Sequence, residues 1–241
     1  MSVESALNQS TKMLHAGASI LDIGGYSSRP NAEHISAAVE INRVVPVIES
    51  LRDKFPEVLI SIDTFRGDVA YAALQAGANM VNDISGGAAD DTMYDVVAEA
   101  QVPYCMMHMK GTPQTMIRET TYNHLIQEIL GFFSERVYAA RKKGVRDIIL
   151  DPGFGFAKNS QQNFELLNQL EIFKVFELPI LVGVSRKSMI YTTLGIDPDK
   201  ALNGTTVLNT LALRNGASIL RVHDIPEAQE VIALLDQIQN N

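Results

Sequence analysis

The chain has 241 residues, a formal net charge of −8 and 46% hydrophobic residues, which is the composition of a folded globular protein and excludes a disordered chain. The acidic charge argues against a nucleic-acid partner, and no apolar run approaches the ~18 residues of a membrane span. The single cysteine, Cys105, excludes a disulfide framework or a cysteine-based zinc site. No signal peptide is visible at the start, so we expect a cytoplasmic protein without membrane attachment.

In chain order, the sequence begins with a helical pattern in which Val3, Ala6, Leu7 and Leu14 share one face. Seven short apolar runs follow, and their nearly continuous hydrophobicity is typical of strands buried on both faces. These runs cover residues 19–24, 58–63, 80–83, 103–108, 147–151, 179–184 and 218–223. The segments between them have helical periodicity, most clearly in residues 41–51, 125–137 and 231–238.

Four joints between a helix and the next strand carry glycine, at Gly17, Gly77, Gly144 and Gly216, which is a signal for a helix end. Alternation of strands and helices predicts parallel strands joined by right-handed crossovers. The strand ends recur at about the spacing of a (β/α)8 TIM barrel, which spends ~31 residues on each unit. We therefore predict one domain over residues 1–241 with this barrel fold; an open doubly wound sheet is the alternative.

A closed barrel needs eight strands, and the sequence shows seven. We therefore expect the first strand and the loop after it to be missing from this chain. A truncated sequence would explain this, and so would a natural variant that dispenses with the strand or recruits it from elsewhere.

Active sites of such barrels lie at the carboxyl ends of the strands, and polar residues follow all seven predicted strands. Asp63, Asn82 and Asp151 suit a flat heterocycle that carries several N–H donors. The cations suit a phosphate or diphosphate; they are Arg29, Lys187, Arg221 and, in addition, His223. A ligand with a hydrogen-bonding ring and an anionic arm would satisfy both sets, with Met107 and Phe156 giving apolar contact to the ring.

A plainer interpretation remains open for the aspartates, because Asp after a strand often caps the next helix; it applies to Asp22, Asp63, Asp83 and Asp224. The glycine-rich segment 151–158 is neither a Walker loop nor G-x-G-x-x-G, because Lys158 stands at the third glycine position. We interpret it as a loop whose glycines allow close approach of a ligand. His108 is interpreted as a packed histidine at a strand end, and Cys105 as a core residue.

Seven segments, in this order along the chain, resemble the dihydropteroate synthase family of pterin-binding (β/α)8 enzymes. They are DIGGYSSRP from Asp22, SIDT from Ser61, NDIS from Asn82, MHMKGTP from Met107, DPGFGFAK from Asp151, SRKS from Ser185 and RVHD from Arg221. The family condenses a dihydropterin methyl diphosphate with 4-aminobenzoate, which yields dihydropteroate and diphosphate on the route to folate. The resemblance thus implies a transferase with small-molecule substrates, a homodimer and Mg2+, although the usual Asn ligand of the metal lies on the missing strand.

The resemblance also implies roles for single residues. The proposed catalytic residues are Asp63, Lys187 and Arg221. Asp63, Asn82 and Asp151 would hold the polar edge of the pterin, Lys187 its carbonyl and N5 side, and Arg221 the ring face. Binding of the diphosphate, or of the carboxylate of the second substrate, would fall to Ser28, Arg29, Arg221 and His223. The pocket would be shaped by Ile84, Met107, Phe156 and Gly183.

The chain departs from the family pattern at Tyr26, Ser28 and Asn31, where Glu, Thr and Gly are usual, and in the segment Thr64-Phe-Arg-Gly. Two other functions stay open. One is pterin binding without turnover, because the first strand is missing. The other is a corrinoid-linked methyltetrahydrofolate methyltransferase of the same fold, against which Ser185-Arg-Lys-Ser and Arg221-Val-His-Asp argue, because a methyl-transfer substrate carries no diphosphate.

Overall fold

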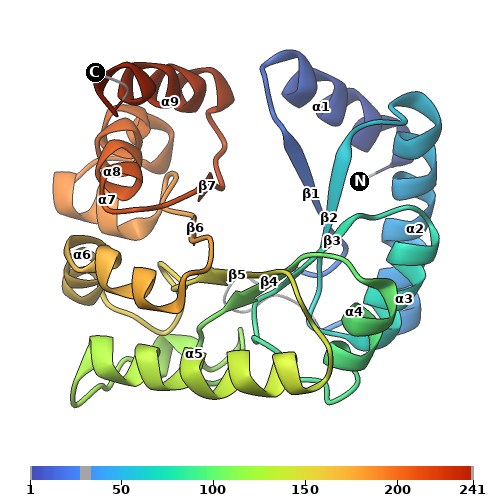
Figure 1. The fold of residues 1–241 in the computed structure, drawn as a ribbon. Coiled ribbons are helices and arrows are strands. Elements are labelled where there is room, and N and C mark those ends of the chain that lie inside the picture. Colours follow the sequence, from blue (N-terminus) through green and yellow to red (C-terminus); the bar gives the residue numbers. More distant parts are fainter. Residues whose placement is uncertain (1, 28–33, 240–241) are drawn as a thin grey trace. The chain divides into compact units, whose positions relative to one another are not determined.

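The computed structural model describes residues 2–27 and 34–239, and within them seven strands alternate with helices, as predicted (Figure 1). The strands are β1 (Ile20–Gly24), β2 (Leu59–Asp63), β3 (Met80–Asp83), β4 (Tyr104–Met107), β5 (Ile148–Asp151), β6 (Leu181–Val182) and β7 (Ile219–Leu220). The helices are α1 (Val3–His15), α2 (Ala37–Lys54), α3 (Gly67–Gln75), α4 (Met93–Ala100), α5 (Leu125–Lys142), α6 (Ser160–Asn168), α7 (Ser188–Leu194), α8 (Leu202–Arg214) and α9 (Ile225–Gln239). Short 3-10 helices are η1 (Met116–Arg118), η2 (Leu170–Phe176) and η3 (Pro198–Lys200).

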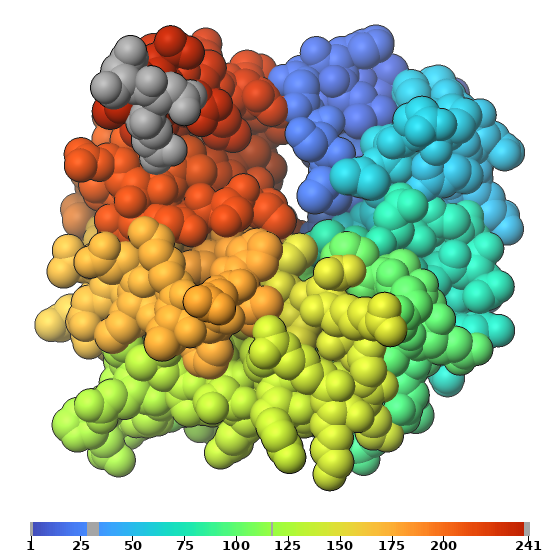
Figure 2. All heavy atoms as spheres, in the orientation of Figure 1, coloured from blue at the N-terminus to red at the C-terminus, as the bar shows by residue number. Residues whose placement is uncertain are grey.

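The chain divides into two compact units, and the first comprises residues 1–107 and 134–148. Its strands β1 to β4 form a parallel sheet in chain order. Helices α1 to α4 contact one another in the same order, and Figure 2 shows them as a continuous surface from blue to green. The fully buried Ile60, Ile62 and Val81 form part of the core of this unit. Because the strands are parallel, their carboxyl ends lie at one edge of the sheet.

Local signals in the sequence explain where the helices begin and end. At the start of α2, the hydroxyl of Ser36 accepts the N–H of Val39, and Val44, Ile48 and Leu51 on the same helix are buried. The four predicted joint glycines follow α1, α3, α5 and α8 with φ between 96° and 110°. That backbone region is open to glycine at little cost, so the prediction of helix ends at these glycines is confirmed.

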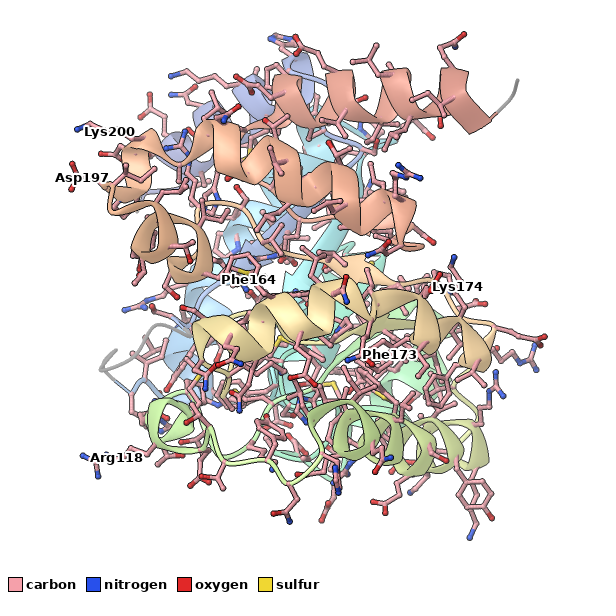
Figure 3. All side chains as sticks on the ribbon, turned by 90° about the vertical axis from the view of Figure 1, so that its left-hand side faces the viewer. Arg118, Phe164, Phe173, Lys174, Asp197 and Lys200 are labelled. Atoms are coloured by element: carbon pink, nitrogen blue, oxygen red, sulfur yellow. The ribbon has the colours of Figure 1, made fainter. Side chains whose placement is uncertain are left out.

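The second unit comprises residues 108–133 and 149–241. Leu150 of β5 bridges Ile180 in parallel fashion, and β6 pairs with β7, also in parallel. The fully buried rings of Phe133 and Phe173 lie 5.9 Å apart and anchor an aromatic core. Figure 3 shows Phe173 with its exposed neighbour Lys174 on η2. Strands β6 and β7 are shorter than the apolar runs that predicted them, because the chain leaves the sheet at Gly183 and Arg221.

Candidate active site

In the first unit, the strand ends bring together the predicted acceptors. Asp63 of β2 lies in register between Gly24 of β1 and Asn82 of β3, so the Asp63 and Asn82 side chains emerge on the same face of the sheet. The amide of Asn82 donates a hydrogen bond of 3.1 Å to the carboxylate of Asp22 on β1. Asp22 thus belongs to this cluster. The sequence signal that could have placed it there is a carboxylate on the strand that neighbours the strand of Asp63.

The predicted apolar residues of this unit are also at strand ends. Met107 is the last residue of β4 and is 2% exposed, and Ile84 follows β3 and is 5% exposed. Ser28 and Arg29 lie outside the described residues, so their predicted role in binding an anion stays a prediction.

The interpretation of the aspartates as helix caps is wrong for three of them. The N-cap positions of α2, α3 and α4 are occupied by Ser36, Arg66 and Thr92 instead of by Asp22, Asp63 and Asp83. Asp83 holds its own loop: its carboxylate accepts the N–H and the hydroxyl of Ser85, the N–H of Gly87 and the hydroxyl of Tyr104, at 2.6 to 2.8 Å. Burial raises the pKa of Asp83, and these four hydrogen bonds oppose the shift.

In the second unit, Asp151 ends β5 and is 7% exposed. Its Oδ1 accepts the N–H of Gly153 at 2.8 Å. Burial raises the pKa of Asp151, while the charges of Lys187, Arg221 and Lys158 and the Gly153 hydrogen bond act in the opposite direction. A buried carboxylate is therefore surrounded by three cations, which is an arrangement that can hold a polar ligand with both donors and acceptors.

Lys187 lies at the N-cap position of α7 and points toward the glycine-rich loop. Its ammonium donates to the carbonyl of Phe154 and lies 4.8 Å from the centre of the Phe156 ring, within cation–π range. Burial lowers the pKa of Lys187 to about 8, with Asp151 raising it and Arg221 lowering it. The predicted ring contacts Lys187 and Phe156 are thus neighbours.

The remaining predicted residues of this unit come from the ends of β6 and β7. A Cβ added at Gly183 would lie 3.6 Å from the Cβ of Arg221, so these two positions adjoin and an alanine would fit. The N–H of His223 donates to the hydroxyl of Ser185 at 3.2 Å, and its Nδ1 lies 3.0 Å from the same oxygen. The second unit therefore gathers Asp151, Phe156, Gly183, Lys187, Arg221 and His223 in connected loops.

Sequence reasoning missed Lys158, which is 7% exposed and supports the glycine-rich loop from within. Its ammonium contacts Nδ1 of His108 at 3.0 Å and donates to the carbonyls of Gly153 and Phe156. Burial lowers the pKa of Lys158 to about 7 and that of His108 to about 2, so the imidazole is neutral and its Nδ1 can accept a hydrogen bond from the lysine ammonium. His108 is 2% exposed, which confirms that it is packed.

The glycines of this loop allow other parts of the chain, His108 and Lys187, to approach the backbone closely. Gly153 has a φ of 75°, and a Cβ there would overlap the carbonyl oxygen of His108. A Cβ at Gly155 would approach Cδ of Lys187 to 3.0 Å. An alanine at either position would therefore disturb the loop, whatever ligand it meets.

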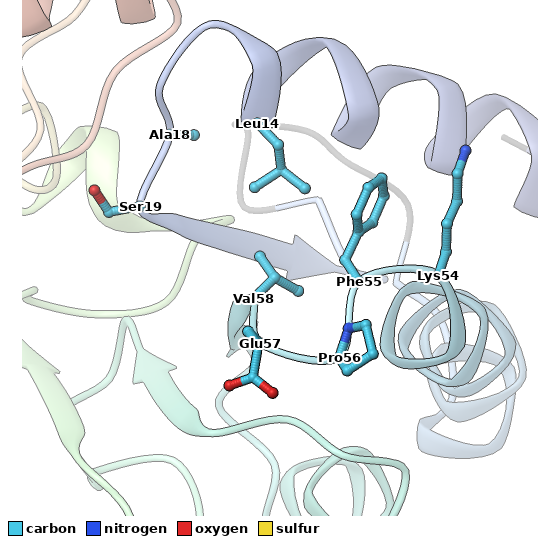
Figure 4. A pocket seen from close by; sticks show the side chains of 8 residues that line it. All are labelled: Leu14, Ala18, Ser19, Lys54, Phe55, Pro56, Glu57 and Val58. Atoms are coloured by element: carbon cyan, nitrogen blue, oxygen red, sulfur yellow. The ribbon is translucent and has the colours of Figure 1, made fainter.

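A pocket of about 470 Å3 lies in the first unit, at the other end of the strands (Figure 4). It is lined by Leu14, Ala18, Ser19, Lys54, Phe55, Pro56, Glu57 and Val58. Ser19 and Val58 precede β1 and β2, whereas Asp63 ends β2. This pocket contains none of the predicted site residues, so we do not place the chemistry there.

Metal-binding groups and membrane-spanning helices were the remaining features that the described residues could contain. Among them, no three His, Cys, Asp or Glu side chains gather into a group that could hold a metal ion. No helix in these segments has the length and apolar character needed to cross a membrane.

Comparison with known proteins decides the family. Residues 1–223 match the family described as pterin binding enzyme. The dihydropteroate synthase of Synechocystis is 45% identical over 240 residues, which is 98% of this chain and 83% of that protein. The chain belongs to the dihydropteroate synthase family of pterin-binding enzymes.

Two solved structures of this family agree with that assignment. Dihydropteroate synthase from Clostridium difficile, in the presence of pteroic acid, has a TM-score of 0.92 and 37% identity and covers 98% of this chain and 88% of its own. The enzyme from Xanthomonas albilineans with 4-aminobenzoic acid has a TM-score of 0.92 and 34% identity, with 98% and 85% covered.

These likenesses confirm several predictions from the sequence. The family resemblance is confirmed, as are the parallel α/β fold of TIM-barrel type and the transferase activity of folate biosynthesis. Small molecules are the substrates of such an enzyme. The roles of single residues remain predictions.

Proposed function

We propose that this chain condenses a dihydropterin methyl diphosphate with 4-aminobenzoate, and that Asp151, Lys187 and Arg221 contact the pterin. The observation that carries this proposal is the buried Asp151 carboxylate with Lys187 and Arg221 as its charged neighbours, on loops that follow three consecutive parallel strands. Asp151 can accept the N–H donors of the ring, and Lys187 can donate to its carbonyl. Asp63 and Asn82 keep the ring-binding roles that the family resemblance implies for them.

The chemistry needs charge stabilisation more than a protein nucleophile. The bond between the pterin methylene carbon and the diphosphate oxygen breaks, and its electron pair leaves with the diphosphate. The amine of 4-aminobenzoate then attacks the methylene carbon and loses a proton to solvent, which closes the balance of atoms and charge. Arg221 and His223 would stabilise the departing diphosphate, and Asp63 would stabilise positive charge that spreads into the ring.

The test is a substitution of Lys187 by alanine, followed by titration with pterin and by an assay of dihydropteroate formation. We expect pterin to bind at least roughly tenfold more weakly, because a charge-assisted donor is lost from a largely buried site. Lys174→Ala is the matched control, because Lys174 is an exposed lysine of the same unit (Figure 3). An unchanged dissociation constant for Lys187→Ala contradicts the site, and pterin binding without dihydropteroate formation by the unaltered chain contradicts the synthase.

The family resemblance also implies a homodimer and dependence on Mg2+, and the sequence pattern predicts one pterin-binding domain over residues 1–241 and a cytoplasmic location; we propose these with the reaction. Light scattering tests the dimer. Assays with and without chelator test the metal.

A further inference from the structure

The residue before Lys187 has an unusual backbone. Arg186 has a φ of 52°, in the left-handed region, and it is the third residue of a turn that the N–H of Lys187 closes on the carbonyl of Val184. Glycine is preferred at such a position, and a bulky residue there costs roughly 1 kcal/mol. Strain of this kind persists only where the surroundings hold the residue in place, and it is often found at functional sites.

The surroundings of Arg186 hold both its backbone and its side chain. Its N–H donates to the hydroxyl of Thr205 on α8 at 3.0 Å. Its guanidinium donates from Nε and Nη2 to the two carboxylate oxygens of Asp224, at 2.9 and 2.7 Å, and from Nη1 to the carbonyl of Asp199 at 2.9 Å. All three guanidinium nitrogens are therefore engaged, and the paired side chains are only 25% and 15% exposed.

This contact joins two loops that carry the proposed ligand-binding cations. Arg186 directly precedes Lys187 at the end of β6, and Asp224 closes the segment after β7 that carries Arg221 and His223. The hydrogen bond from His223 to Ser185 joins the same two loops a second time. A bidentate ion pair fixes both the distance and the relative orientation of the two side chains, which a single hydrogen bond does not.

We infer that Arg186, paired with Asp224, is a positioning residue that holds Lys187 in a fixed geometry for the ligand. The inference rests on the proposed function, because it assumes that Lys187 binds the pterin. On this view the strained turn at Arg186 aims the lysine, and the four hydrogen bonds offset the strain.

The test is a double-mutant cycle on pterin affinity with the variants Arg186→Met, Lys187→Ala and their combination. If Arg186 acts by positioning Lys187, Arg186→Met raises the dissociation constant by roughly tenfold in the unaltered chain and by less than about twofold once Lys187 is alanine. An arginine that only adds general stability would give the same fold-change in both backgrounds, and that result overturns the inference. An unchanged affinity for Arg186→Met overturns it as well.

The design separates this inference from the proposed function. If Lys187→Ala alone leaves pterin affinity unchanged, the proposed site fails; if it weakens binding but the effect of Arg186→Met is additive, only the positioning role fails. Should Arg186→Met not fold, Asp224→Asn and Arg186→Lys replace it in the cycle, and we expect Arg186→Lys to be intermediate because lysine keeps the charge without the fork.

The matched control is Lys200→Met, which removes the exposed ion pair with Asp197 (Figure 3). These side chains are 73% and 77% exposed, and their charged atoms are 3.4 Å apart. We expect this variant to bind pterin as the unaltered chain does, because exposed pairs contribute little. A loss of affinity equal to that of Arg186→Met would show that any ion pair near η3 matters and would overturn the specific role of Arg186.

Discussion

Two aspartates, Asp83 at the end of β3 and Asp151 at the end of β5, share the same sequence signal but have different surroundings in the fold. Both are buried, at 0% and 7% exposure, and burial raises the pKa of both. The carboxylate of Asp83 accepts four hydrogen bonds, three from its own loop and one from Tyr104. The carboxylate of Asp151 accepts the N–H of Gly153 and is otherwise balanced by the charges of nearby cations.

The difference separates an aspartate that builds the fold from one that can serve a ligand. Four short hydrogen bonds occupy the acceptor positions of Asp83, so a ligand would have to break the loop to reach it. The charge of Asp151 is compensated by nearby cations that act through space. One of them, Lys187, donates a hydrogen bond to a backbone carbonyl, and it can exchange that acceptor for a ligand atom. We therefore expect substitution of Asp83 to affect folding and substitution of Asp151 to affect binding.

The largest effect is expected for Asp83→Ala. It leaves the buried hydroxyl of Tyr104 and the N–H groups of Ser85 and Gly87 without their acceptor. We expect the free energy of unfolding to fall by about 3 kcal/mol, since each orphaned buried donor costs ~1–3 kcal/mol. Urea denaturation measures this, and a loss below about 1 kcal/mol would show that the loop does not depend on Asp83.

The next effect is expected for Asp151→Asn, in binding. Pterin affinity should fall by roughly 10- to 30-fold, because the amide presents a donor where a ring N–H needs an acceptor. The raised pKa means that the folded chain binds the Asp151 proton more tightly than the unfolded chain does, so the buried charge lowers stability at neutral pH. Asn removes that cost, but it also leaves the buried Lys187 and Lys158 without the carboxylate that stabilises their charge, so we expect the two changes in urea stability to offset one another. A variant that loses stability but keeps its affinity would contradict the ligand-binding role of Asp151.

A smaller effect is expected for Tyr104→Phe, which removes one donor from Asp83 and leaves the shape of the core unchanged. The hydroxyl of Tyr104 lies 2.6 Å from the carboxylate, and the side chain is fully buried. We expect a loss of about 1.5 kcal/mol in the free energy of unfolding, with pterin affinity unchanged. Tyr138→Phe is the control, since that tyrosine is 70% exposed. An equal loss of unfolding free energy in both variants would show that the hydrogen bond from Tyr104 to Asp83 has no special role in stability.

The smallest effect is a pH dependence of binding through Lys187. Its pKa is lowered to about 8, so its protonated fraction falls about fourfold between pH 7 and pH 8.5. Pterin affinity should decline over this interval in the unaltered chain more than in Lys187→Arg, which stays charged. Titration of the ligand itself is common to both proteins and cancels in their ratio; a ratio that is flat with pH would mean that Lys187 does not bind as the ammonium.

Much of the fold could be predicted because its signals are local. The helix-end glycines and the apolar stripe of α2 act within a few residues of themselves, so the order of elements and the helix ends followed from the sequence. Parallel strands then place their carboxyl ends at one edge, which explains why reading those ends found Asp63, Asn82, Asp151 and Lys187.

What the sequence alone determined is thus the alternation of strands and helices and the set of polar residues at the strand ends. The tertiary structure decided which of those residues are occupied by the protein itself, because hydrogen-bond partners and burial depend on atoms distant in the chain. Tyr104 reaches Asp83 and Asp224 reaches Arg186 across 21 and 38 residues, and Lys158 reaches His108 across 50. Only folding brings such groups within 3 Å of one another and removes the water that would otherwise screen their charges. Which groups are structural and which can bind a ligand is therefore a property of the folded chain.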